Sequence, residues 1–401
     1  MHLDRLAILG LVSLIATAPS MPARADEKLA VEIVYLAQDV ERLAPLSLLD
    51  PVEIPDEGLA GARLGQKDNQ TTGGFLGHDY RLDDVSVPME GDPVEAARDV
   101  LGRGKAILVV DAPADTILAI ADLPEAEDAL IFNVGAEDDR LRTDDCRANL
   151  FHIVPSRAMK ADALAQYLAW KRWRNWLLIH GTAGPDLLMK AALERSATKF
   201  GAKIVETRAY EYEATARRTD SGHVQIQTQM PVFTQNAAAH DVIVVADESD
   251  VFGEYLPYRT WDADPVTGTH GLMPTAWHRS HEQWGGTQMQ GRFEDSAGRW
   301  MTEKDYAAWL AVRTVGEAVT RTNSADAKAL HDYLVSDQFE IAAFKGEGLT
   351  FRTWNQQMRQ PVLLVAPRML VSVSPQEEFL HQRTPLDTLG FDQPESTCAL
   401  N

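Results

Sequence analysis

The stretch that decides the fold, residues 92–134, reads DPVEAARDVLGRGKAILVVDAPADTILAIADLPEAEDALIFNV. It opens with an N-cap aspartate and a first-turn proline, followed by apolar residues at helical spacing. Residues 106–110 and 129–134 are continuous apolar runs of strand length, and residues 116–121 begin a second helix between them. Helices that alternate with uninterrupted apolar strands predict a parallel sheet covered by helices on both faces.

The same alternation extends on both sides of this stretch. Toward the N-terminus, residues 31–37 and 80–87 have the pattern of strands, and residues 58–71 that of a helix between them. After Pro155 a second round begins, in which we expect helices at 161–173 and 185–200 and strands at 176–179, 202–207 and 241–246. Two rounds of this size predict two similar α/β lobes rather than one large sheet.

The last third of the chain predicts a return to the first lobe, because helical patterns resume at 303–320 and 325–336. The fold class is therefore α/β, with two Rossmann-like lobes joined by a three-segment hinge. We expect lobe one to contain residues 26–153 plus 278–345, and lobe two residues 154–277 plus 346–374. Residues 375–401 are expected to form a polar C-terminal tail along the surface.

The N-terminus has the pattern of a secretory signal peptide over residues 1–25. Arg5 precedes an apolar run at 6–16, and a small-x-small site follows at Ala23-Arg24-Ala25. The run is short for a bilayer span, and the alternative is an uncleaved anchor helix. We predict a periplasmic protein with no stable membrane insertion after cleavage.

Charge and cysteine content narrow the function further. Acidic residues outnumber basic ones, 59 to 38, for a formal net charge of −21. This balance disfavours binding to nucleic acid or to anionic lipid. The two cysteines, Cys146 and Cys398, suggest one disulfide in an oxidising compartment, with two free thiols as the alternative.

Several short motifs, in their order, resemble those of a known family. They are Gly58 to Leu64 with Gly73-Gly74, Leu130 to Ala136, and Ile179-His180-Gly181. The order resembles the type I periplasmic solute-binding proteins, the branched-chain amino acid receptor class of ABC importers. The resemblance implies a monomer that is not an enzyme, closes two lobes around a small-molecule ligand, and has an ABC permease as partner.

A narrower resemblance concerns residues 351–361, FRTWNQQMRQP. This segment looks like the subgroup associated with alcohol dehydrogenase systems that depend on pyrroloquinoline quinone (PQQ). The resemblance implies that PQQ is a bound ligand, captured for cofactor supply or uptake, and that a PQQ-dependent dehydrogenase is a partner. No catalytic cofactor and no metal site are expected.

Candidate ligand-binding residues follow the predicted strands, because ligands of open α/β sheets sit beyond the carboxyl ends of the strands. The alternative for each of them is ordinary capping or turn chemistry. These residues are Asp111, Ala112, Asn133, Gly135, His180 and Asp247. Asp111 departs from the amino acid receptors, which use small hydroxyl residues there to hold a carboxylate.

A second candidate set combines aromatic and basic residues. Aromatic faces stack on flat rings and arginine binds carboxylates in bidentate fashion, which suits a planar, multiply carboxylated quinone such as PQQ. The alternative is that the tryptophans pack the lobe and the histidines are solvated. The set is Arg259, Trp277, His278, Arg279 and Trp284.

Three rival functions remain open. The ligand could be an amino acid or another small carboxylate instead of PQQ. The protein could be an enzyme or redox accessory of a periplasmic dehydrogenase, although the sequence lacks a nucleophile elbow, a P-loop and an HExxH motif. It could also be a sensor subunit that presents its closed lobes to a membrane partner.

Overall fold

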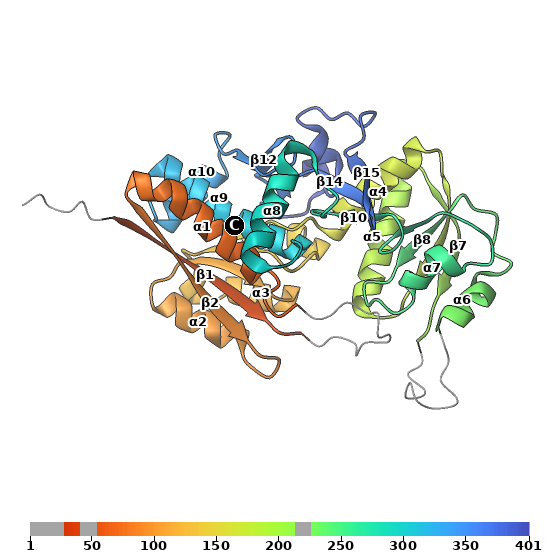
Figure 1. The fold of residues 1–401 in the computed structure, drawn as a ribbon, viewed down its shortest axis with the longest axis horizontal. Helices are drawn as coiled ribbons and strands as arrows, with labels where there is room; N and C mark the ends of the chain where they lie inside the picture. The colour runs from red at the N-terminus through yellow and green to blue at the C-terminus, as the bar shows by residue number, and fades with distance from the viewer. Residues whose placement is uncertain (1–27, 41–53, 213–225, 401) are drawn as a thin grey trace, which may run out of the picture.

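Lobe one is built on a five-stranded parallel sheet. The computed structural model describes residues 28–40, 54–212 and 226–400, and Figure 1 shows its two lobes side by side. The strand order in lobe one is β2-β1-β3-β4-β5, and every pairing is parallel. The strands are β1 (Leu29–Gln38), β2 (His78–Val87), β3 (Ile107–Asp111), β4 (Leu130–Asn133) and β5 (Leu150–His152).

Helices cover both faces of this sheet because its strands are apolar on both sides. Along β1, Ile33 and Tyr35 pack into one core, while Val34 and Leu36 pack into a second core on the opposite face. The first core holds α1 (Leu59–Leu76), α8 (Gly286–Ala297), α9 (Glu303–Thr322) and α10 (Ala327–Leu334). The second holds α2 (Pro93–Gly102) and α3 (Ala114–Ala121).

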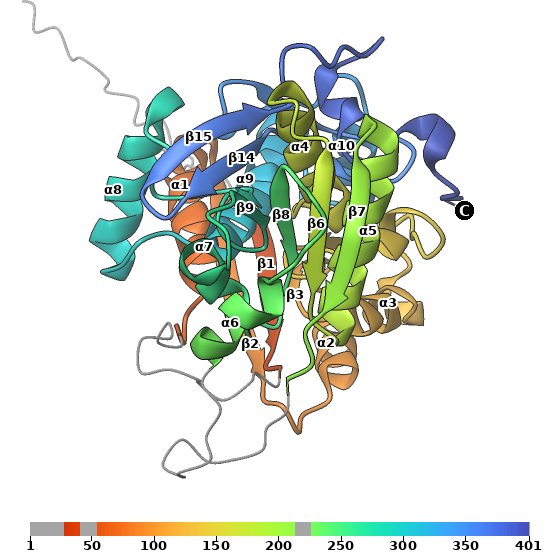
Figure 2. The same ribbon diagram turned by 90° about the vertical axis from the view of Figure 1, so that its right-hand side faces the viewer.

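Lobe two repeats the arrangement with a four-stranded parallel sheet of order β7-β6-β8-β9. Helices lie on both faces of this sheet (Figure 2). Its strands are β6 (Asn175–His180), β7 (Lys203–Ala209), β8 (Val242–Ala246) and β9 (Val266–Gly268). Its helices are α4 (Arg157–Trp170) and α5 (Gly184–Phe200) on one face, and α6 (Ile226–Thr234) and α7 (Leu256–Arg259) on the other. The predicted fold of two α/β lobes is confirmed.

Two small antiparallel sheets and six short 3₁₀ turns complete the elements of the described residues. One sheet contains β10 (Met273–Thr275), β14 (Val362–Ala366) and β15 (Met369–Ser374), and the other β11 (Ile341–Ala342), β12 (Gly348–Phe351) and β13 (Met358–Arg359). The turns are η1 (Pro124–Ala126), η2 (Asp139–Arg142), η3 (Gly253–Tyr255), η4 (Gln283–Gly285), η5 (Pro385–Thr388) and η6 (Gln393–Glu395).

The chain passes between the lobes three times, at residues 154–157, 275–277 and 360–362, which we name the first, second and third crossings. The third crossing comes later than the sequence analysis expected. Phe351 contacts two aromatic rings of lobe one: it packs edge-to-face on Phe151, at 4.9 Å between centroids, and stacks on Phe339 at 5.4 Å. Residues 346–359 therefore pack with lobe one, and the return to lobe two follows at Val362.

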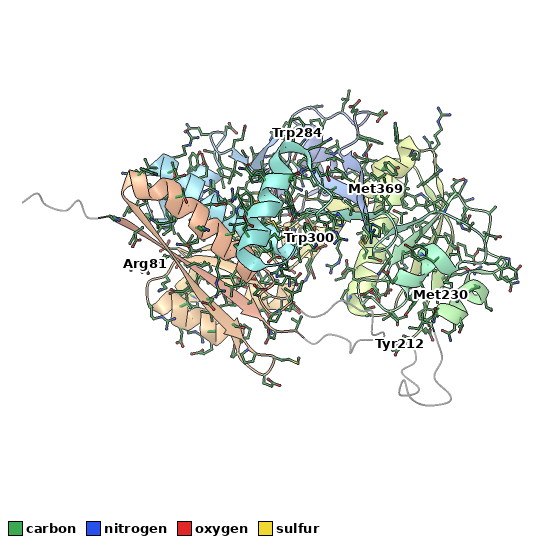
Figure 3. The ribbon with its side chains drawn as sticks, in the orientation of Figure 1. Arg81, Tyr212, Met230, Trp284, Trp300 and Met369 are labelled. Atoms are coloured by element: carbon green, nitrogen blue, oxygen red, sulfur yellow. A yellow bond between two sulfur atoms is a disulfide. The ribbon has the colours of Figure 1, made fainter. Side chains whose placement is uncertain are left out.

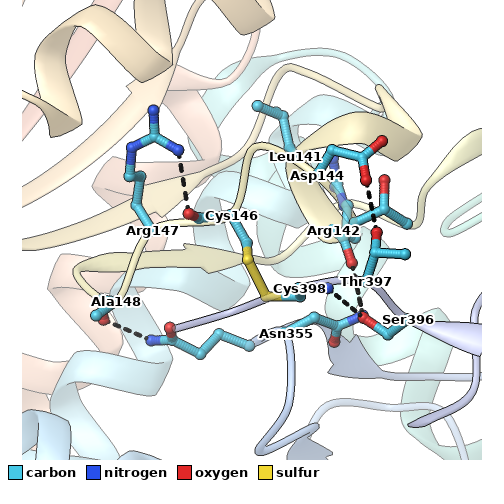
Figure 4. The surroundings of a disulfide bond; sticks show 12 residues. Leu141, Arg142, Asp144, Cys146, Arg147, Ala148, Asn355, Ser396, Thr397 and Cys398 are labelled. Carbon is cyan, nitrogen blue, oxygen red and sulfur yellow. Dashed lines mark hydrogen bonds between the residues drawn. A yellow bond between two sulfur atoms is a disulfide. The ribbon is translucent and has the colours of Figure 1, made fainter. Parts of the chain in front are cut away.

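The C-terminal tail joins the two lobes instead of only lying along the surface. Leu389 is buried in the core of lobe two, and the buried Asp387 accepts hydrogen bonds from Arg352 and Arg359. At its end, Cys398 is disulfide-bonded to Cys146 of lobe one, 252 residues away in sequence (Figure 4). The tail thus packs on one lobe and is covalently attached to the other.

The predicted signal peptide, residues 1–25, lies outside the described residues. Among the residues that are described, no helix is both long and apolar enough to cross a membrane.

Candidate functional site

A cleft of about 1170 Å³ lies between the lobes. Its walls come from the carboxyl ends of the strands in both sheets, as expected for open α/β sheets. Lobe one contributes the loops after β3 and β4, and lobe two contributes the N-terminus of α5 and the loops after β8 and β9. The lining residues include Asp111 to Asp115, Gly135 to Asp138, Gly184-Pro185, Asp247-Glu248 and Gly268 to His270.

The first turn of α3 faces the cleft, and among the described residues no side chain caps its N-terminus. The preceding residue, Pro113, has no side chain that can cap the helix, and Ala114 and Asp115 line the cleft. The first-turn N–H groups of a helix have no partner within the helix, and the helix dipole makes this end positive. This end of α3 suits an anionic group of a small ligand.

Asn133 fixes the conformation of the loop after β4 through hydrogen bonds to the loop backbone. Its buried side-chain oxygen accepts hydrogen bonds from the N–H groups of Gly135 and Ala136, at 3.1 and 2.8 Å. Its amide nitrogen donates to the carbonyl oxygen of Ala136 at 2.7 Å. Asn133 does not line the cleft, but it fixes the loop that brings Gly135 and Glu137 there.

Asp247 has the same function for the loop after β8. Its buried carboxylate accepts hydrogen bonds from the N–H groups of Val251, Phe252 and Gly253, at 2.6 to 3.1 Å. These bonds curl the chain back on itself and place Glu248 and Glu254 on the wall of the cleft. The loop geometry is therefore set by backbone hydrogen bonds to one buried acid.

Charged side chains on the cleft wall are mostly acidic. Among the described residues, nine carboxylates line it, against four basic side chains. The carboxylates are Asp111, Asp115, Glu137, Asp138, Asp247, Glu248, Asp250, Glu254 and Glu303. The basic residues are Arg140, Arg157, Lys160 and Lys304.

Each of these four cations already has a carboxylate partner. Lys304 pairs with Asp111 at 3.1 Å, and Arg140 with Asp115. Arg157 and Lys160 each pair with two carboxylates. Those of Arg157 are Asp138 and Glu248, and those of Lys160 are Glu137 and Glu303. Among the described lining residues, no Lys or Arg is left over for an anionic ligand, and the wall has an excess of negative charge.

The pairs at the floor of the cleft also connect the lobes. Arg157 and Lys160 lie in the first turn of α4, whose core belongs to lobe two, while Glu137 and Asp138 follow β4 of lobe one. Burial raises the pKa of Glu137, and Lys160 opposes that change. Burial alone would lower the pKa of Lys160, but Glu137 and Glu303 raise it overall. The floor is therefore an ion-pair network in which two cations hold four carboxylates.

Comparison with known proteins identifies the family. A sequence profile described as "Periplasmic binding protein" matches residues 56–368. The chain belongs to the periplasmic binding protein family. This membership gives it a periplasmic location and the general role of binding a small solute, consistent with the cleft. No curated protein matches the chain.

Solved structures of this family share the fold at low sequence identity. A branched-chain amino acid ABC transporter periplasmic ligand-binding protein from Burkholderia xenovorans is 17% identical, with TM-score 0.68, covering 92% of this chain and 99% of its own. A leucine-, isoleucine-, valine-, threonine- and alanine-binding protein from Brucella ovis is 13% identical, with TM-score 0.64, covering 84% and 89%. An ABC transporter solute-binding protein from R. palustris in complex with benzoate is 10% identical, with TM-score 0.63, covering 92% and 100%.

Five of the residues predicted from sequence line the cleft of this periplasmic binding protein: Asp111, Ala112, Gly135, Asp247 and His278. Their contact with a ligand stays a prediction. His180 lies behind the wall, nearly buried, with its Nδ1 2.7 Å from the carbonyl oxygen of Gly181.

Apart from His278, the aromatic and basic set does not gather at the cleft. Trp277 is buried in the core of lobe one, stacked on Tyr306 at 4.6 Å between ring centroids, because its large apolar surface is covered there. Trp284 is 65% exposed and lies at the opposite end of α8 from Trp300 (Figure 3). Arg279 is exposed beside Trp300, and Arg259 is exposed at the end of α7. The structure therefore does not bring together the tryptophans expected to stack on a quinone and the arginines expected to bind its carboxylates.

The segment that carries the PQQ resemblance, residues 351–361, has a structural role at the hinge. The side-chain amide of Gln360 donates to the carbonyl oxygen of Ile153 at 2.6 Å, and that of Gln357 donates to Val154 at 3.1 Å. Arg142 donates to Gln357 at 2.8 Å. These buried side chains tie the third crossing to the first, and they do not line the cleft.

Sequence reasoning missed the floor of the cleft. Arg157 and Lys160 could have been found from Ser156, because serine is a preferred N-cap residue and a helix that starts there has both cations in its first turn. Glu137 and Glu248 follow predicted strands directly. The pairing of these cations with particular carboxylates depends on how the two lobes pack against each other, and no sequence pattern predicts that pairing.

Proposed function

We propose that this protein captures a small solute with an amine cation, of the amino acid class, between its lobes and delivers it to an ABC permease. No chemical step is assigned to it. The observation that supports the proposal is the charge of the cleft wall, where carboxylates outnumber basic residues nine to four in the described part of the chain. A positively charged group is attracted to such a wall, and the low dielectric of a closing cleft strengthens the attraction.

The same charge balance argues against PQQ as the ligand. A multiply carboxylated quinone would have to approach a wall whose cations are already paired with carboxylates. The arginines expected to hold it, Arg259 and Arg279, lie outside the cleft lining. The amino acid alternative therefore has more support than the PQQ interpretation.

An amino acid would use both kinds of group in the cleft. Its carboxylate fits the uncapped N-terminus of α3 in lobe one. Its ammonium group fits the carboxylates of the loop after β8 in lobe two, where Glu254 has no ion-pair partner among the described residues. A solute that contacts both walls stabilises the closed arrangement of the lobes.

Titration of the purified chain, residues 26–401, tests the proposal after refolding from denaturant to remove bound solute. Calorimetry and thermal shift with the common amino acids, simple amines and PQQ should show saturable binding of at least one amine-bearing solute and none of PQQ. Glu254→Gln should weaken that binding several-fold, whereas Glu127→Gln, an exposed control away from the cleft, should leave it unchanged. Stoichiometric binding of PQQ without binding of any amine would refute the proposal.

A further inference from the structure

Lys345 is a buried cation at the hinge that the cleft does not use. It lies between β11 and β12, with 4% of its surface exposed. Its ammonium group donates hydrogen bonds to the carbonyl oxygen of Ala276 and, at 3.0 Å, to that of Pro361. The ammonium lies 5.1 Å from the centre of the Tyr306 ring. Among the described residues, no carboxylate forms an ion pair with it, although a buried cation normally has one.

The two carbonyl groups belong to the second and third crossings. The antiparallel pairing of β10 with β14 ends at Thr275 and Leu363. Ala276 follows Thr275 directly, and Pro361 stands two residues before Leu363. Lys345 thus joins the two segments at the point where their backbone ladder stops.

The peptide groups around Ala276 are held by charged side chains on both sides. The N–H group of Ala276 donates to Glu303 at 2.5 Å, and its carbonyl oxygen accepts from Lys345. Glu303 also accepts from Lys160 of α4 at 2.9 Å, so this contact continues into the floor of the cleft. The second crossing is therefore fixed between one anion and one cation.

We propose that Lys345 is a positioning residue for lobe closure, and that its protonated amine restrains the second and third crossings while its neutral amine lets them separate more freely. The inference rests on the proposed capture of a solute by lobe closure. Hydrogen bonds from an ionised donor are roughly twice as strong as those between neutral groups. Loss of the proton keeps the contacts but weakens both.

The surroundings allow this change of charge near neutral pH. Burial lowers the pKa of Lys345 to about 7, and Glu303 opposes the change. Two other titratable groups face it. Burial lowers the pKa of His281, whose Nε2 lies 2.7 Å from the carbonyl oxygen of Phe344, and burial raises the pKa of Tyr306 well above its usual value. His281 and Tyr306 are both neutral above neutral pH, so Lys345 is the group that titrates there.

Lobe separation in the ligand-free protein tests the inference. Asp99→Cys in α2 and Ala191→Cys in α5 are exposed positions on different lobes that can carry spin labels. The distance distribution between them should broaden, and its open fraction should rise several-fold, from about pH 6 to about pH 8.5, with half of the change near pH 7. The distance distribution should be broad at every pH in Lys345→Met. It should be narrow at every pH in Lys345→Arg, which keeps its charge.

Lys328→Met is the matched control, because this lysine side chain is 78% exposed and lies away from the hinge. It should keep the wild-type pH profile. A wild-type distribution that does not change with pH would overturn the inference, as would a Lys345→Met protein that keeps the wild-type profile. Because no ligand is added, failure of the amino acid proposal would show in the titrations and not in these distances.

Discussion

At the scale of single residues, the charge of Lys345 restrains the hinge but lowers the stability of the folded protein. Its pKa is lowered from 10.5 to about 7 in the folded chain. Between these values the unfolded chain binds a proton that the folded chain does not, so the free energy of unfolding rises with pH across this window. Below about pH 7 the folded protein bears the full cost of a buried cation.

Lys345→Met should therefore increase stability at neutral pH, by on the order of a few kcal/mol, because it removes the desolvated charge. It should also flatten the dependence of the unfolding free energy on pH between about pH 7 and pH 10. Urea unfolding at a series of pH values measures both effects. A variant that is less stable at pH 7 would show that the two carbonyl contacts contribute more than the burial of the charge costs.

A residue could be placed from sequence when the contacts that fix it lie nearby in the chain, and not when they lie far away in the chain. Asp111 and Gly135 were found because they directly follow apolar strands, and the strand ends define the cleft. Trp277 was misplaced because an aromatic side chain beside basic residues has the same pattern in a binding site as at the edge of a core. The structure resolves this through Tyr306, which lies 29 residues further along the chain and covers its ring.

At the scale of elements, α4 connects the hinge to the floor of the cleft. The helical pattern predicted its start at residue 161, but the helix begins at Arg157 because Ser156 caps it. The Ser156 hydroxyl accepts a hydrogen bond from the N–H group of Met159 at 3.3 Å. This four-residue extension brings Arg157 and Lys160 into the first turn and next to their carboxylates.

Ser156→Ala should destabilise the protein by about 1 kcal/mol, the usual effect of losing an N-cap side chain. Because Arg157 follows the cap directly, the variant should also weaken the Arg157 pairs with Asp138 and Glu248. Chemical denaturation gives the stability change, and Ser156→Thr, which keeps the hydroxyl and can still cap, should restore most of it. Equal destabilisation by alanine and threonine would argue against a capping role.

Strand prediction succeeded where burial is local, whereas the assignment of a segment to a lobe failed where it depends on distant contacts. The runs 106–110 and 129–134 are apolar on both faces and need only their own sheet, and the structure places β3 and β4 there. The segment 346–359 contains similar apolar residues, but its lobe is decided by Phe151 and Phe339, which pack on Phe351. Sequence spacing does not encode that partner choice.

At the scale of the whole molecule, the tail limits how far the lobes can move. It packs on lobe two through Leu389, while Asp387 binds Arg352 and Arg359 of the segment 346–359, which packs with lobe one. Its last turn is bonded to lobe one through Cys398, and Thr397 donates to Asp144 at 2.6 Å nearby. The disulfide limits how far the tail, and the part of lobe two on which it packs, can move away from Cys146.

Cys398→Ser should lower the free energy of unfolding by about 2–5 kcal/mol, because the bond closes a loop across 252 residues and restricts the unfolded chain. Calorimetric unfolding measures the loss, and the double variant with Cys146→Ser should be no less stable than the single one, since both remove the same bond. A reductant should reproduce the effect in the wild-type protein and leave both variants unchanged. Lobe separation should broaden at the same time, since only hydrogen bonds and ion pairs, such as those of Asp387 and Thr397, then attach the tail to lobe one. Wild-type stability in Cys398→Ser would mean that these contacts and the packing of Leu389 are sufficient to hold the tail, and that the disulfide does not restrain the lobes.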